Sequence, residues 1–405
     1  MIPFSPPYID QDIIDEVVDT LKSGWITSGP RVRKLEDDVA SFCGIERVVC
    51  LNSATSGLIL ALKWFGIGIG DEVIIPSYTY SATALAVLHA GATPVMVDVL
   101  DDFTADPSLI RSAITERTKA VIPVDIGGWP AHYDEIISIV NDEEIRKLFT
   151  PVTDEQRKLN RIIVISDAAH SFGARYRNLP TGALVDLTVF SFHAVKNITT
   201  AEGGAICIGL PDTFNHKEIY KLLKLMSLNG QTKDAYSKSE AGGWKYDIIL
   251  QGHKMNMPDI CAAIGLAQLR KYKTMILPER KRIVMLYNKY FAKFNWAQLP
   301  VLSNENTESS YHIYALRIKG ISEIQRDEMI NIISCNQVSV NVHFIPMPML
   351  TLFKNLGYSI HDHKVSYDNY SREISLPVYP QLSDHQVEII VNAVVGAYNK
   401  VKANA

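Results

Sequence analysis

Two side chains in this chain could carry covalent and acid–base chemistry, the amine of Lys196 and the carboxylate of Asp167. Lys196 lies in "SFHAVKNITTAEGG" (191–204), and Asp167 lies in "RIIVISDA" (161–168), so each follows a run of strand-forming residues. Taken alone, the lysine is most simply a solvated loop side chain and the aspartate a turn or helix cap. The chemical alternative is a lysine that binds a carbonyl covalently and an acid that binds a cationic nitrogen.

A third feature is a cluster of hydroxyl groups at the start of a predicted helix. "NSATSGLILAL" (52–62) places Ser53, Thr55 and Ser56 where a strand passes into a helix. Hydroxyl and backbone N–H groups at a helix N-terminus bind anions and phosphates, although the same residues also serve as a simple N-cap. Tyr80 follows the next predicted strand, and a lone aromatic side chain is usually a packing residue.

These features form one chemical set when they are taken together. Pyridoxal phosphate requires a phosphate site, an aromatic face for its ring, an acid for its pyridine nitrogen and a lysine for its aldehyde. An acid that keeps the ring nitrogen protonated lets the ring accept the electrons of a carbanion, and the lysine can then move the proton. The sequence therefore predicts a pyridoxal-phosphate site at the carboxyl ends of strands, where ligands gather in α/β sheets.

The elements that position these residues alternate between short apolar runs and helical patterns. The predicted strands are 48–53, 72–77, 94–99, 119–126, 161–168, 187–194 and 204–209. Most are apolar throughout, which is typical of strands buried on both faces, and the alternation with helices predicts an α/β fold with a mainly parallel seven-stranded sheet. We expect a large cofactor-binding domain over 1–255 and a smaller C-terminal α/β domain over 256–405.

Other segments have simpler interpretations. The N-terminal stretch 10–24 has the apolar spacing of a helix that Gly24 ends, and the polar stretch 229–243 is typical of a mobile loop. The stretch 258–291 predicts a long helix, in which a cluster of alanine and glycine residues would let another backbone approach closely. A final amphipathic helix is expected from about Asp384.

Composition excludes several classes of function. The chain has 405 residues, of which 47% are hydrophobic and 21% charged, and its net charge of -4 favours neither nucleic acid nor anionic membranes. We see neither a bilayer-spanning apolar run nor a signal peptide. The five cysteines are scattered without a CxxC pattern, so neither a disulfide framework nor a metal site is expected. These patterns favour a soluble, cytoplasmic protein.

The chain resembles the DegT/StrS-type nucleotide-sugar aminotransferases, which are fold type I pyridoxal-phosphate enzymes. The resemblance covers nearly the whole chain in family order, and "SFHxxKxxxxxEGG" is its most specific motif. It is carried by "SGWITSGPRVRKLE", "NSATSGLILAL", "GDEVIIPSYTYSATALAVLHAGATPVMVDV", "SDAAHSFGA", "SFHAVKNITTAEGG", "MPDICAAIGLAQLRK", "VHFIP" and "EISLPVYPQLSDHQV".

The resemblance implies a role for each matching residue. Lys196 is similar to the catalytic lysine that binds the cofactor as an imine, and Asp167 to the catalytic partner of the pyridine nitrogen. The other implied cofactor contacts are Thr55, Ser56 and Ser191 at the phosphate, Tyr80 on the ring, His170 near the phenolic oxygen, and Asn256 reaching the phosphate of the neighbouring subunit.

Substrate contacts are implied less specifically. Lys254 belongs to a "GxKxN" form that resembles the branch of the family that aminates carbon 4 of sugars. His343 matches a substrate residue, but a lone histidine after a strand could equally be a packing or capping residue. The chain departs from the family pattern at Pro348, where many members have a second histidine, at Ser166, where an acid is common, and over 138–160, which looks like a surface insertion.

The resemblance implies a transaminase that moves an amino group from L-glutamate to a nucleotide-linked keto-deoxy sugar, most simply a UDP-linked 4-keto-6-deoxyhexose, for surface polysaccharide or glycoconjugate synthesis. The alternatives are a pyridoxal-phosphate-dependent sugar dehydratase and a non-catalytic regulator on the same fold. Relatives that remove a hydroxyl group have histidine at the lysine position, so Lys196 argues against the dehydratase. A homodimer with shared active sites is expected, because Asn256 matches a residue that crosses between subunits and the alanine-rich helix offers a packing face.

Overall fold

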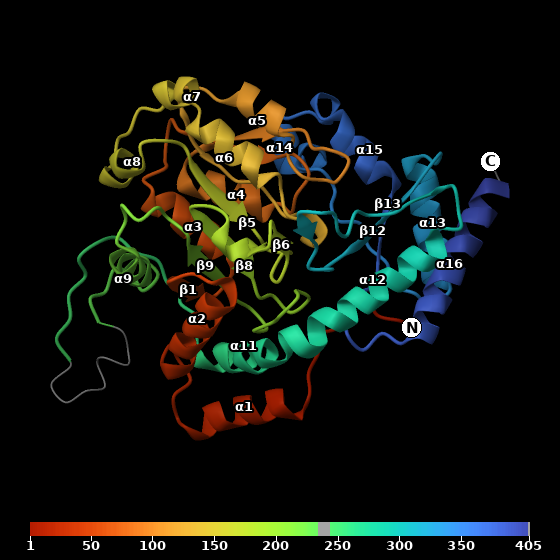
Figure 1. Ribbon diagram of the computed structural model, residues 1–405, viewed down its shortest axis with the longest axis horizontal. Helices are drawn as coiled ribbons and strands as arrows, with labels where there is room; N and C mark the ends of the chain where they lie inside the picture. The colour runs from red at the N-terminus through yellow and green to blue at the C-terminus, as the bar shows by residue number, and fades with distance from the viewer. Residues whose placement is uncertain (234–243, 404–405) are drawn as a thin grey trace.

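The computed structural model describes residues 1–233 and 244–403, and its centre is a seven-stranded sheet (Figure 1). In sheet order the strands are β1 (Arg47–Leu51), β9 (Gly204–Ile208), β8 (Leu187–Ser191), β5 (Ile163–Asp167), β4 (Thr118–Val121), β2 (Glu72–Pro76) and β3 (Thr93–Val97). Strand β9 runs antiparallel to β1 and β8, and the remaining pairs are parallel. The predicted seven-stranded, mainly parallel sheet is confirmed, and each predicted strand is present.

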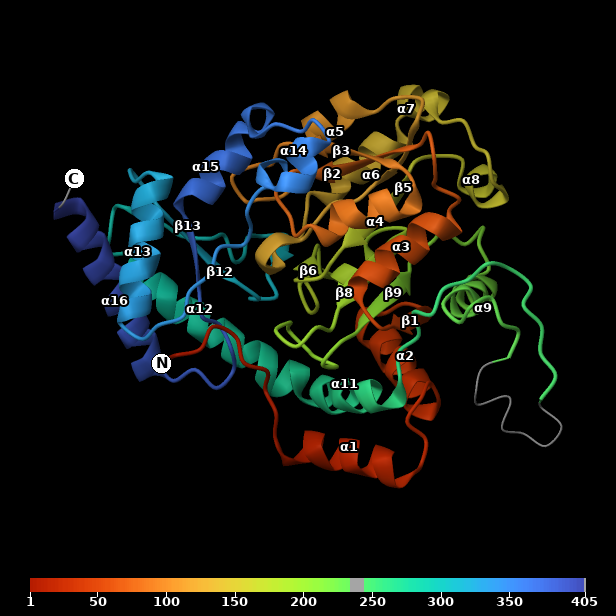
Figure 2. The same ribbon diagram turned by 180° about the vertical axis from the view of Figure 1, so that it is seen from behind.

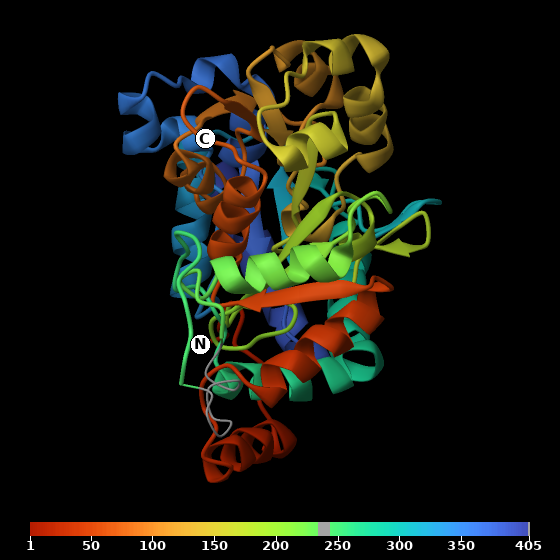
Figure 3. The ribbon, with the colours of Figure 1, turned by 90° about the vertical axis from the view of Figure 1, so that its left-hand side faces the viewer.

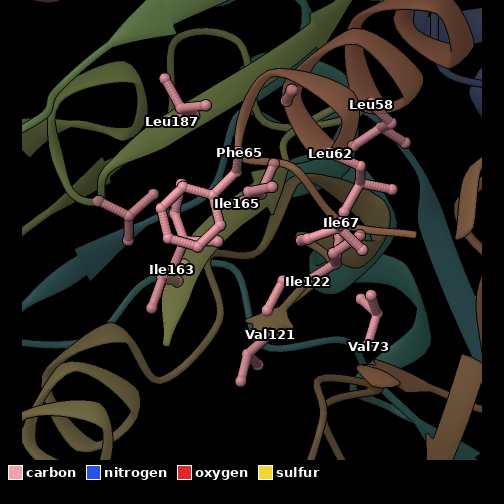
Figure 4. Packing of buried hydrophobic residues seen from close by; sticks show 14 of the residues in the cluster. Leu58, Leu62, Phe65, Ile67, Val73, Val121, Ile122, Ile163, Ile165 and Leu187 are labelled. Atoms are coloured by element: carbon pink, nitrogen blue, oxygen red, sulfur yellow. The ribbon is translucent and has the colours of Figure 1, made fainter. Parts of the chain in front are cut away.

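The strands stay in place because both faces of the sheet are buried. The β5, β8 and β9 side chains are buried at every position, which the unbroken apolar runs of the sequence require. Figure 4 shows how the apolar side chains of α3 (Ala54–Trp64), such as Leu58 and Leu62, pack toward residues of β2, β4 and β5. This core fixes the carboxyl ends of the parallel strands along one edge of the sheet.

Helices cover the sheet and extend the chain beyond it (Figures 1 and 2). The helices before residue 230 are α1 (Gln11–Lys22), α2 (Pro30–Cys43), α3, α4 (Ala82–Ala90), α5 (Pro107–Ala113), α6 (Tyr133–Asn141), α7 (Glu143–Leu148), α8 (Asp154–Leu159) and α9 (His216–Met226). Helix α1, drawn in red, lies at one end of the molecule (Figure 3). No helix among the described residues is long and apolar enough to cross a membrane.

The predicted long helix is present as α11 (Asp259–Lys271), a π-helical turn (Tyr272–Ile276) and α12 (Leu277–Phe291). Its small residues do permit a close approach, because a Cβ added at Gly265 would lie 2.7 Å from Thr200 and 3.0 Å from Leu35. The partners in this approach belong to the same chain, and α11 packs against α1 and α2. The close approach at Gly265 is therefore made within one chain, and the expectation that this helix also packs against a second subunit stays a prediction.

The C-terminal part is built on a second sheet. Its strands, in sheet order, are β10 (Ala297–Gln298), β12 (Tyr314–Ile318) and β13 (Glu373–Leu376), and its helices are α13 (Glu323–Cys335), α14 (Thr351–Asn355), α15 (Lys364–Arg372) and α16 (Asp384–Ala403). A third small sheet has β6 (Arg175–Tyr176) at its centre, between β11 (Thr307–Glu308) and β7 (Leu179–Pro180). The domain boundary at residues 255 and 256 stays a prediction.

The segments 138–160 and 229–243 were expected to be a surface insertion and a loop. The stretch 138–160 forms the end of α6 and the short helices α7 and α8, and its buried Gln156 donates a hydrogen bond to the Phe65 carbonyl at the end of α3. The segment therefore also satisfies the C-terminus of a core helix. Of the predicted loop 229–243, residues 234–243 lie outside the described residues.

The glycine pair after Lys196 provides the first prediction. A Cβ at Gly204 would lie 2.5 Å from the backbone nitrogen of Ala54, so Gly204→Ala must push the start of α3 away from β9. We expect it to lower the free energy of unfolding by about 1–3 kcal/mol, as overpacking does. Gly396→Ala is the matched control, because Gly396 lies in α16 with no atom within 4 Å of the new Cβ; it should stabilise the protein by about 0.5–1 kcal/mol. Denaturant unfolding of both variants measures the difference, and wild-type stability of Gly204→Ala would contradict the packing argument.

Candidate active site

A cavity of about 430 Å³ opens at the carboxyl ends of the parallel strands. The β1–α3 turn, the ends of β2, β5 and β8, and loops of the C-terminal part all contribute to its wall. Of the residues that the sequence singled out, the cavity is lined by Thr55, Tyr80, Asp167, His170, Ser191, Lys196 and His343. Residues separated by nearly 300 positions in the sequence therefore meet, because strand ends converge at one edge of a parallel sheet.

The N-terminus of α3 faces this cavity. Ser53 caps the helix by accepting a hydrogen bond from the backbone N–H of Ser56 at 3.1 Å, and Ser53 and Thr55 both line the cavity. The Ser56 hydroxyl instead donates to Asn52 Oδ1 at 2.7 Å and accepts from Ser53, so it lies behind the cavity wall. The helix end and its hydroxyl groups make an anion site.

Asp167 is the buried acid of the cavity. Its Oδ2 accepts a hydrogen bond from the Thr83 hydroxyl at 2.8 Å, and its Oδ1 accepts one from the backbone N–H of Ala169 at 3.3 Å. Burial raises the pKa of Asp167, while these two hydrogen bonds and the charge of Lys196 act in the opposite direction. A cationic group placed against this carboxylate would be strongly favoured.

A second buried carboxylate, Asp125, lies behind Asp167. It accepts hydrogen bonds from the Tyr133 hydroxyl at 2.6 Å, from the Ser171 hydroxyl at 2.5 Å and from the backbone N–H of Ala131 at 2.9 Å. Burial raises its pKa to about 6, and the charge of Asp167 contributes to this rise. The hydroxyl groups of Ser166 and Tyr133 are hydrogen-bonded at 2.6 Å. Ser166, which stands where the family often has an acid, is therefore part of the same hydrogen-bonded network as Asp125.

Lys196 is the amine of the cavity. Burial lowers the pKa of Lys196 to about 8, while the charge of Asp167 opposes this shift. The next residue, Asn197, holds the loop in place through its side-chain amide, which donates to the carbonyl oxygens of Phe172 and Ser310 and to the Tyr272 hydroxyl. A lysine with this pKa is about one-tenth neutral at pH 7, far more than an ordinary lysine, and the neutral amine is the form that attacks carbonyl groups.

Two histidines line the cavity with fixed and opposite polarity. Nδ1 of His170 accepts the backbone N–H of Gly127 at 3.2 Å, so the ring proton is on Nε2. Because the amide nitrogen of Asn197 is already a donor to three groups, its Oδ1 accepts the Nδ1–H of His312 at 2.8 Å. Burial lowers the pKa of both rings far below the usual value, so both are neutral. The rings lie 4.5 Å apart and carry one donor and one acceptor nitrogen beside the amine of Lys196.

Aromatic side chains form the outer wall. Tyr80 is 61% exposed, and its ring centre lies 5.7 Å from that of Phe344. Phe4, from the N-terminal segment, stacks on His343 at 5.3 Å and lines the cavity as well. Tyr80 therefore has an open face at the rim, as a residue that stacks on a flat ligand needs.

Lys254 and Asn256 lie outside the lining of this cavity in the single chain. The Lys254 amine donates to Asn256 Oδ1 at 2.7 Å, and the Asn256 amide donates to the Ser28 hydroxyl at 2.6 Å. Asn256 and Ser28 line a separate surface pocket of about 490 Å³. The structure thus brings together seven of the ten predicted residues and leaves Ser56, Lys254 and Asn256 apart.

Sequence reasoning missed the residues that support this arrangement. Thr83, Asp125 and Asn197 act on Asp167, Lys196 and His312 through contacts within the fold, and no local motif marks them. His312 had a weak signal, since it lies just before the strand "YALRI". The cavity nonetheless supplies an amine, a buried carboxylate, an aromatic face and a helix N-terminus with hydroxyl groups, and this donor set fits pyridoxal phosphate.

Comparison with known proteins gives consistent results. A model of the DegT/DnrJ/EryC1/StrS aminotransferase family matches residues 7–149 and 153–395. The chain is 35% identical over 398 residues to the spore coat polysaccharide biosynthesis protein SpsC of Bacillus subtilis, covering 97% of this chain and 96% of that protein. It is 32% identical over 403 residues to a UDP-4-amino-4-deoxy-L-arabinose–oxoglutarate aminotransferase of Shewanella sediminis, covering 97% of each.

Solved structures agree in fold. A Streptococcus pneumoniae protein described as a sugar aminotransferase superposes in its apo form with a TM-score of 0.95 and 42% identity, over 99% of this chain and 98% of that chain. The same protein has been solved in PMP and PLP forms. Helicobacter pylori PseC, an aminotransferase involved in the biosynthesis of pseudoaminic acid, superposes with a TM-score of 0.85 and 26% identity, over 98% of this chain and 99% of that chain.

The charge pair in the cavity gives the second prediction. In the cofactor-free enzyme, labelling of Lys196 by an amine reagent should follow its neutral fraction, with a midpoint near pH 8. Asp167→Asn removes the charge that raises the pKa of Lys196, so the midpoint should move to lower pH. Peptide mass mapping of the labelled protein measures both profiles, and Lys196→Ala identifies the peptide. An unchanged midpoint in Asp167→Asn would show that the two side chains do not interact.

Proposed function

The chain belongs to the DegT/DnrJ/EryC1/StrS aminotransferase family and is a pyridoxal-phosphate-dependent sugar aminotransferase, and we propose that it moves an amino group from L-glutamate to a nucleotide-linked keto-deoxy sugar. The observation that carries the proposal is the pairing of Lys196 with Asp167 in one cavity beside the N-terminus of α3. An intact amine and an intact acid are what transamination requires. They disfavour both the dehydratase and the non-catalytic regulator.

In the proposed reaction each side chain has one task. Bound pyridoxal phosphate supplies an electron sink for the carbanion formed beside the amino group. Asp167 would bind the ring nitrogen and keep it protonated, and Ser53, Thr55 and Ser191 would hold the phosphate at the helix end. Nζ of Lys196 would hold the cofactor and, once free, would accept and return the proton at the reacting carbon. His170, with its proton on Nε2, would donate a hydrogen bond to the phenolic oxygen.

The proposed substrate is a UDP-linked 4-keto-6-deoxyhexose, and the product an amino sugar for surface polysaccharide or glycoconjugate synthesis. Support comes from the "GHKMN" segment and from the name of the Shewanella relative, which pairs a UDP-linked 4-amino sugar with oxoglutarate. Oxoglutarate is the keto acid that L-glutamate becomes when it gives up its amino group. The relationship to a spore coat polysaccharide protein supports the pathway class.

The third prediction tests the substrate. The enzyme is converted to its amine form with L-glutamate, freed of donor, and mixed with a panel of nucleotide-linked 4-keto and 3-keto sugars. We expect amination at carbon 4 and the fastest single turnover with a UDP-linked 4-keto-6-deoxy sugar, identified by NMR of the product. Lys196→Ala should aminate none of them. Amination of 3-keto sugars alone would contradict the proposed substrate.

We also propose a homodimer in which Lys254 and Asn256 complete the partner's active site. Both lie outside the cavity of their own chain, and their hydrogen bonds lead to Ser28 on another surface. The preceding segment exposes apolar side chains, since Trp244 is 78% and Ile249 59% exposed. Clustered exposed apolar residues are typical of an interface.

The fourth prediction tests this sharing. Lys196→Ala and Asn256→Asp should each be poorly active alone. In a mixed dimer one site carries both defects and the other carries neither, so purified mixed dimers should have about half of wild-type activity and an equal co-refolded mixture about a quarter. A mixture of Lys196→Ala with Asp167→Asn is the matched control and should restore nothing, because both residues act within their own subunit. Failure of mixed dimers to regain activity in the first pairing would show that Asn256 serves its own subunit.

A further inference from the structure

Glu373 is a buried acid that the reaction described above does not use. It begins β13 and is 0% exposed. One carboxyl oxygen lies 2.5 Å from the Ser375 hydroxyl, and the other accepts the backbone N–H of His343 at 3.1 Å. Ser375, two residues along the strand and on the same face, lies 2.8 Å from Nδ1 of His343. A continuous hydrogen-bonded chain therefore joins a buried carboxyl group to a ring that lines the active-site cavity.

The other nitrogen of the His343 ring is open to the cavity. Phe4 stacks on one side of the ring and Phe344 meets it edge-on, so the ring orientation is fixed. The ring is hydrogen-bonded to Ser375 through Nδ1, and Nε2 is not among the four buried side-chain atoms that lack a partner in the described part of the chain. Since His343 lines the cavity, Nε2 is the atom that a bound substrate meets.

The protonation state of Glu373 decides which group donates in each hydrogen bond of the Glu373–Ser375–His343 chain. A serine hydroxyl has one proton to donate, and a neutral imidazole has one. When Glu373 is ionised, Ser375 donates to it, Nδ1–H donates to Ser375, and Nε2 is a bare acceptor. When Glu373 is protonated, its carboxyl group donates to Ser375, Ser375 donates to Nδ1, and Nε2 carries the ring proton, while the backbone N–H of His343 still donates to Glu373. The same side chains thus present either an acceptor or a donor to the cavity.

The surroundings favour the donor state at neutral pH. Burial raises the pKa of Glu373 to about 8, against the opposing effects of its bonds to Ser375 and His343 and of the charges of Arg326 and Arg317. Burial lowers the pKa of His343 to about 3, and the nearby charge of Lys196 acts in the same direction. Tyr78 donates to the His343 carbonyl, and burial raises the pKa of Tyr78 far above its usual value. His170 and His312 also interact electrostatically with His343, and burial lowers the pKa of both far below the usual value, so both are neutral. The His343 ring is therefore neutral throughout, and within the hydrogen-bonded chain of Glu373, Ser375 and His343 it is Glu373 that changes its protonation state.

We propose that Glu373 is a positioning residue that acts through Ser375 and His343 to present an N–H donor to the keto oxygen of the sugar substrate. The proposal rests on the proposed function, since it assigns the partner of the Nε2–H group as a ketone. A ketone oxygen can only accept a hydrogen bond, so it distinguishes the two states of the chain. With Nε2 unprotonated, two lone pairs would face one another, and binding of the keto sugar would be weakened.

The experiment compares the sugar half-reaction at pH 7 and pH 9. Because one pKa near 8 separates the two states, wild-type kcat/KM for the keto sugar should fall about tenfold between these pH values. Glu373→Gln holds the donor state, because its amide nitrogen donates to Ser375 and its amide oxygen still accepts the His343 N–H. In this variant the tenfold fall caused by Glu373 should be absent, and any pH dependence that remains is the one that Lys196, whose pKa is also about 8, gives to both half-reactions. The half-reaction with L-glutamate, in the same preparations, is the control and should not show this difference between wild type and variant.

A substrate-free measurement separates the inference from the proposed function. In protein labelled with ¹⁵N-histidine, the His343 signal of the wild type should change from the Nε2–H to the Nδ1–H tautomer as pH rises through about 8, and His343→Gln assigns the signal. Glu373→Gln should keep the Nε2–H tautomer over the whole range. Should that variant fold poorly, Ser375→Ala breaks the chain and should likewise abolish the pH-dependent change. If the wild-type tautomer does not change with pH, the proposed coupling of Glu373 to His343 is wrong. If the tautomer changes but no keto sugar is aminated, the coupling holds and the proposed sugar substrate is wrong.

Discussion

A buried carboxylate at the end of β5 is the constraint on which this structure depends. Asp167 is 6% exposed, and an isolated charge in such a place is costly unless it is paired and hydrogen-bonded. Thr83 and the Ala169 backbone satisfy its two oxygens, and Lys196 supplies a positive charge in the same cavity. The carboxylate is thereby held ready for a cationic ring nitrogen, and the fold carries the cost of burying it before any ligand binds.

The scaffold meets this requirement through close backbone approaches. Gly204 lets the start of α3 lie against β9, so the anion site of the helix end meets the edge of the sheet that carries Asp167. The amide of Asn197 ties the loop after β8 to Phe172 and Ser310, and so connects the amine-bearing loop to the C-terminal part. Rigid elements therefore supply the positions, and single side chains supply the chemistry.

The sequence predicted those features that depend on local pattern. Unbroken apolar runs identified all seven strands of the sheet, and the combination of Asp167 and Lys196 with a hydroxyl cluster and Tyr80 pointed to a cofactor site. The partners of these residues were not predictable, because Thr83 and Asp125 reach the site only through the packing of α4 and the loop after β4. The alanine-rich face of α11 is a pattern that the sequence could interpret only in part. Its small residues indicate that another backbone packs closely against it, but they do not say whether that backbone belongs to the same chain. Ser56 shares its motif with Thr55, yet the first turn of the helix directs its hydroxyl to Asn52 instead of the cavity.

The three histidines of the cavity are neutral, because they are buried near the amine of Lys196. A second fixed positive charge near Lys196 would be unfavourable, and burial together with that amine lowers the pKa of His170, His312 and His343. Neutral rings are useful to a polar substrate only if each nitrogen has a defined role, and each ring has one nitrogen occupied by a partner from the protein: the Gly127 backbone, Asn197 and Ser375. The first two partners cannot titrate, so those tautomers are permanent. Ser375 transmits the state of Glu373, which makes His343 the one ring of the three whose polarity can change with pH.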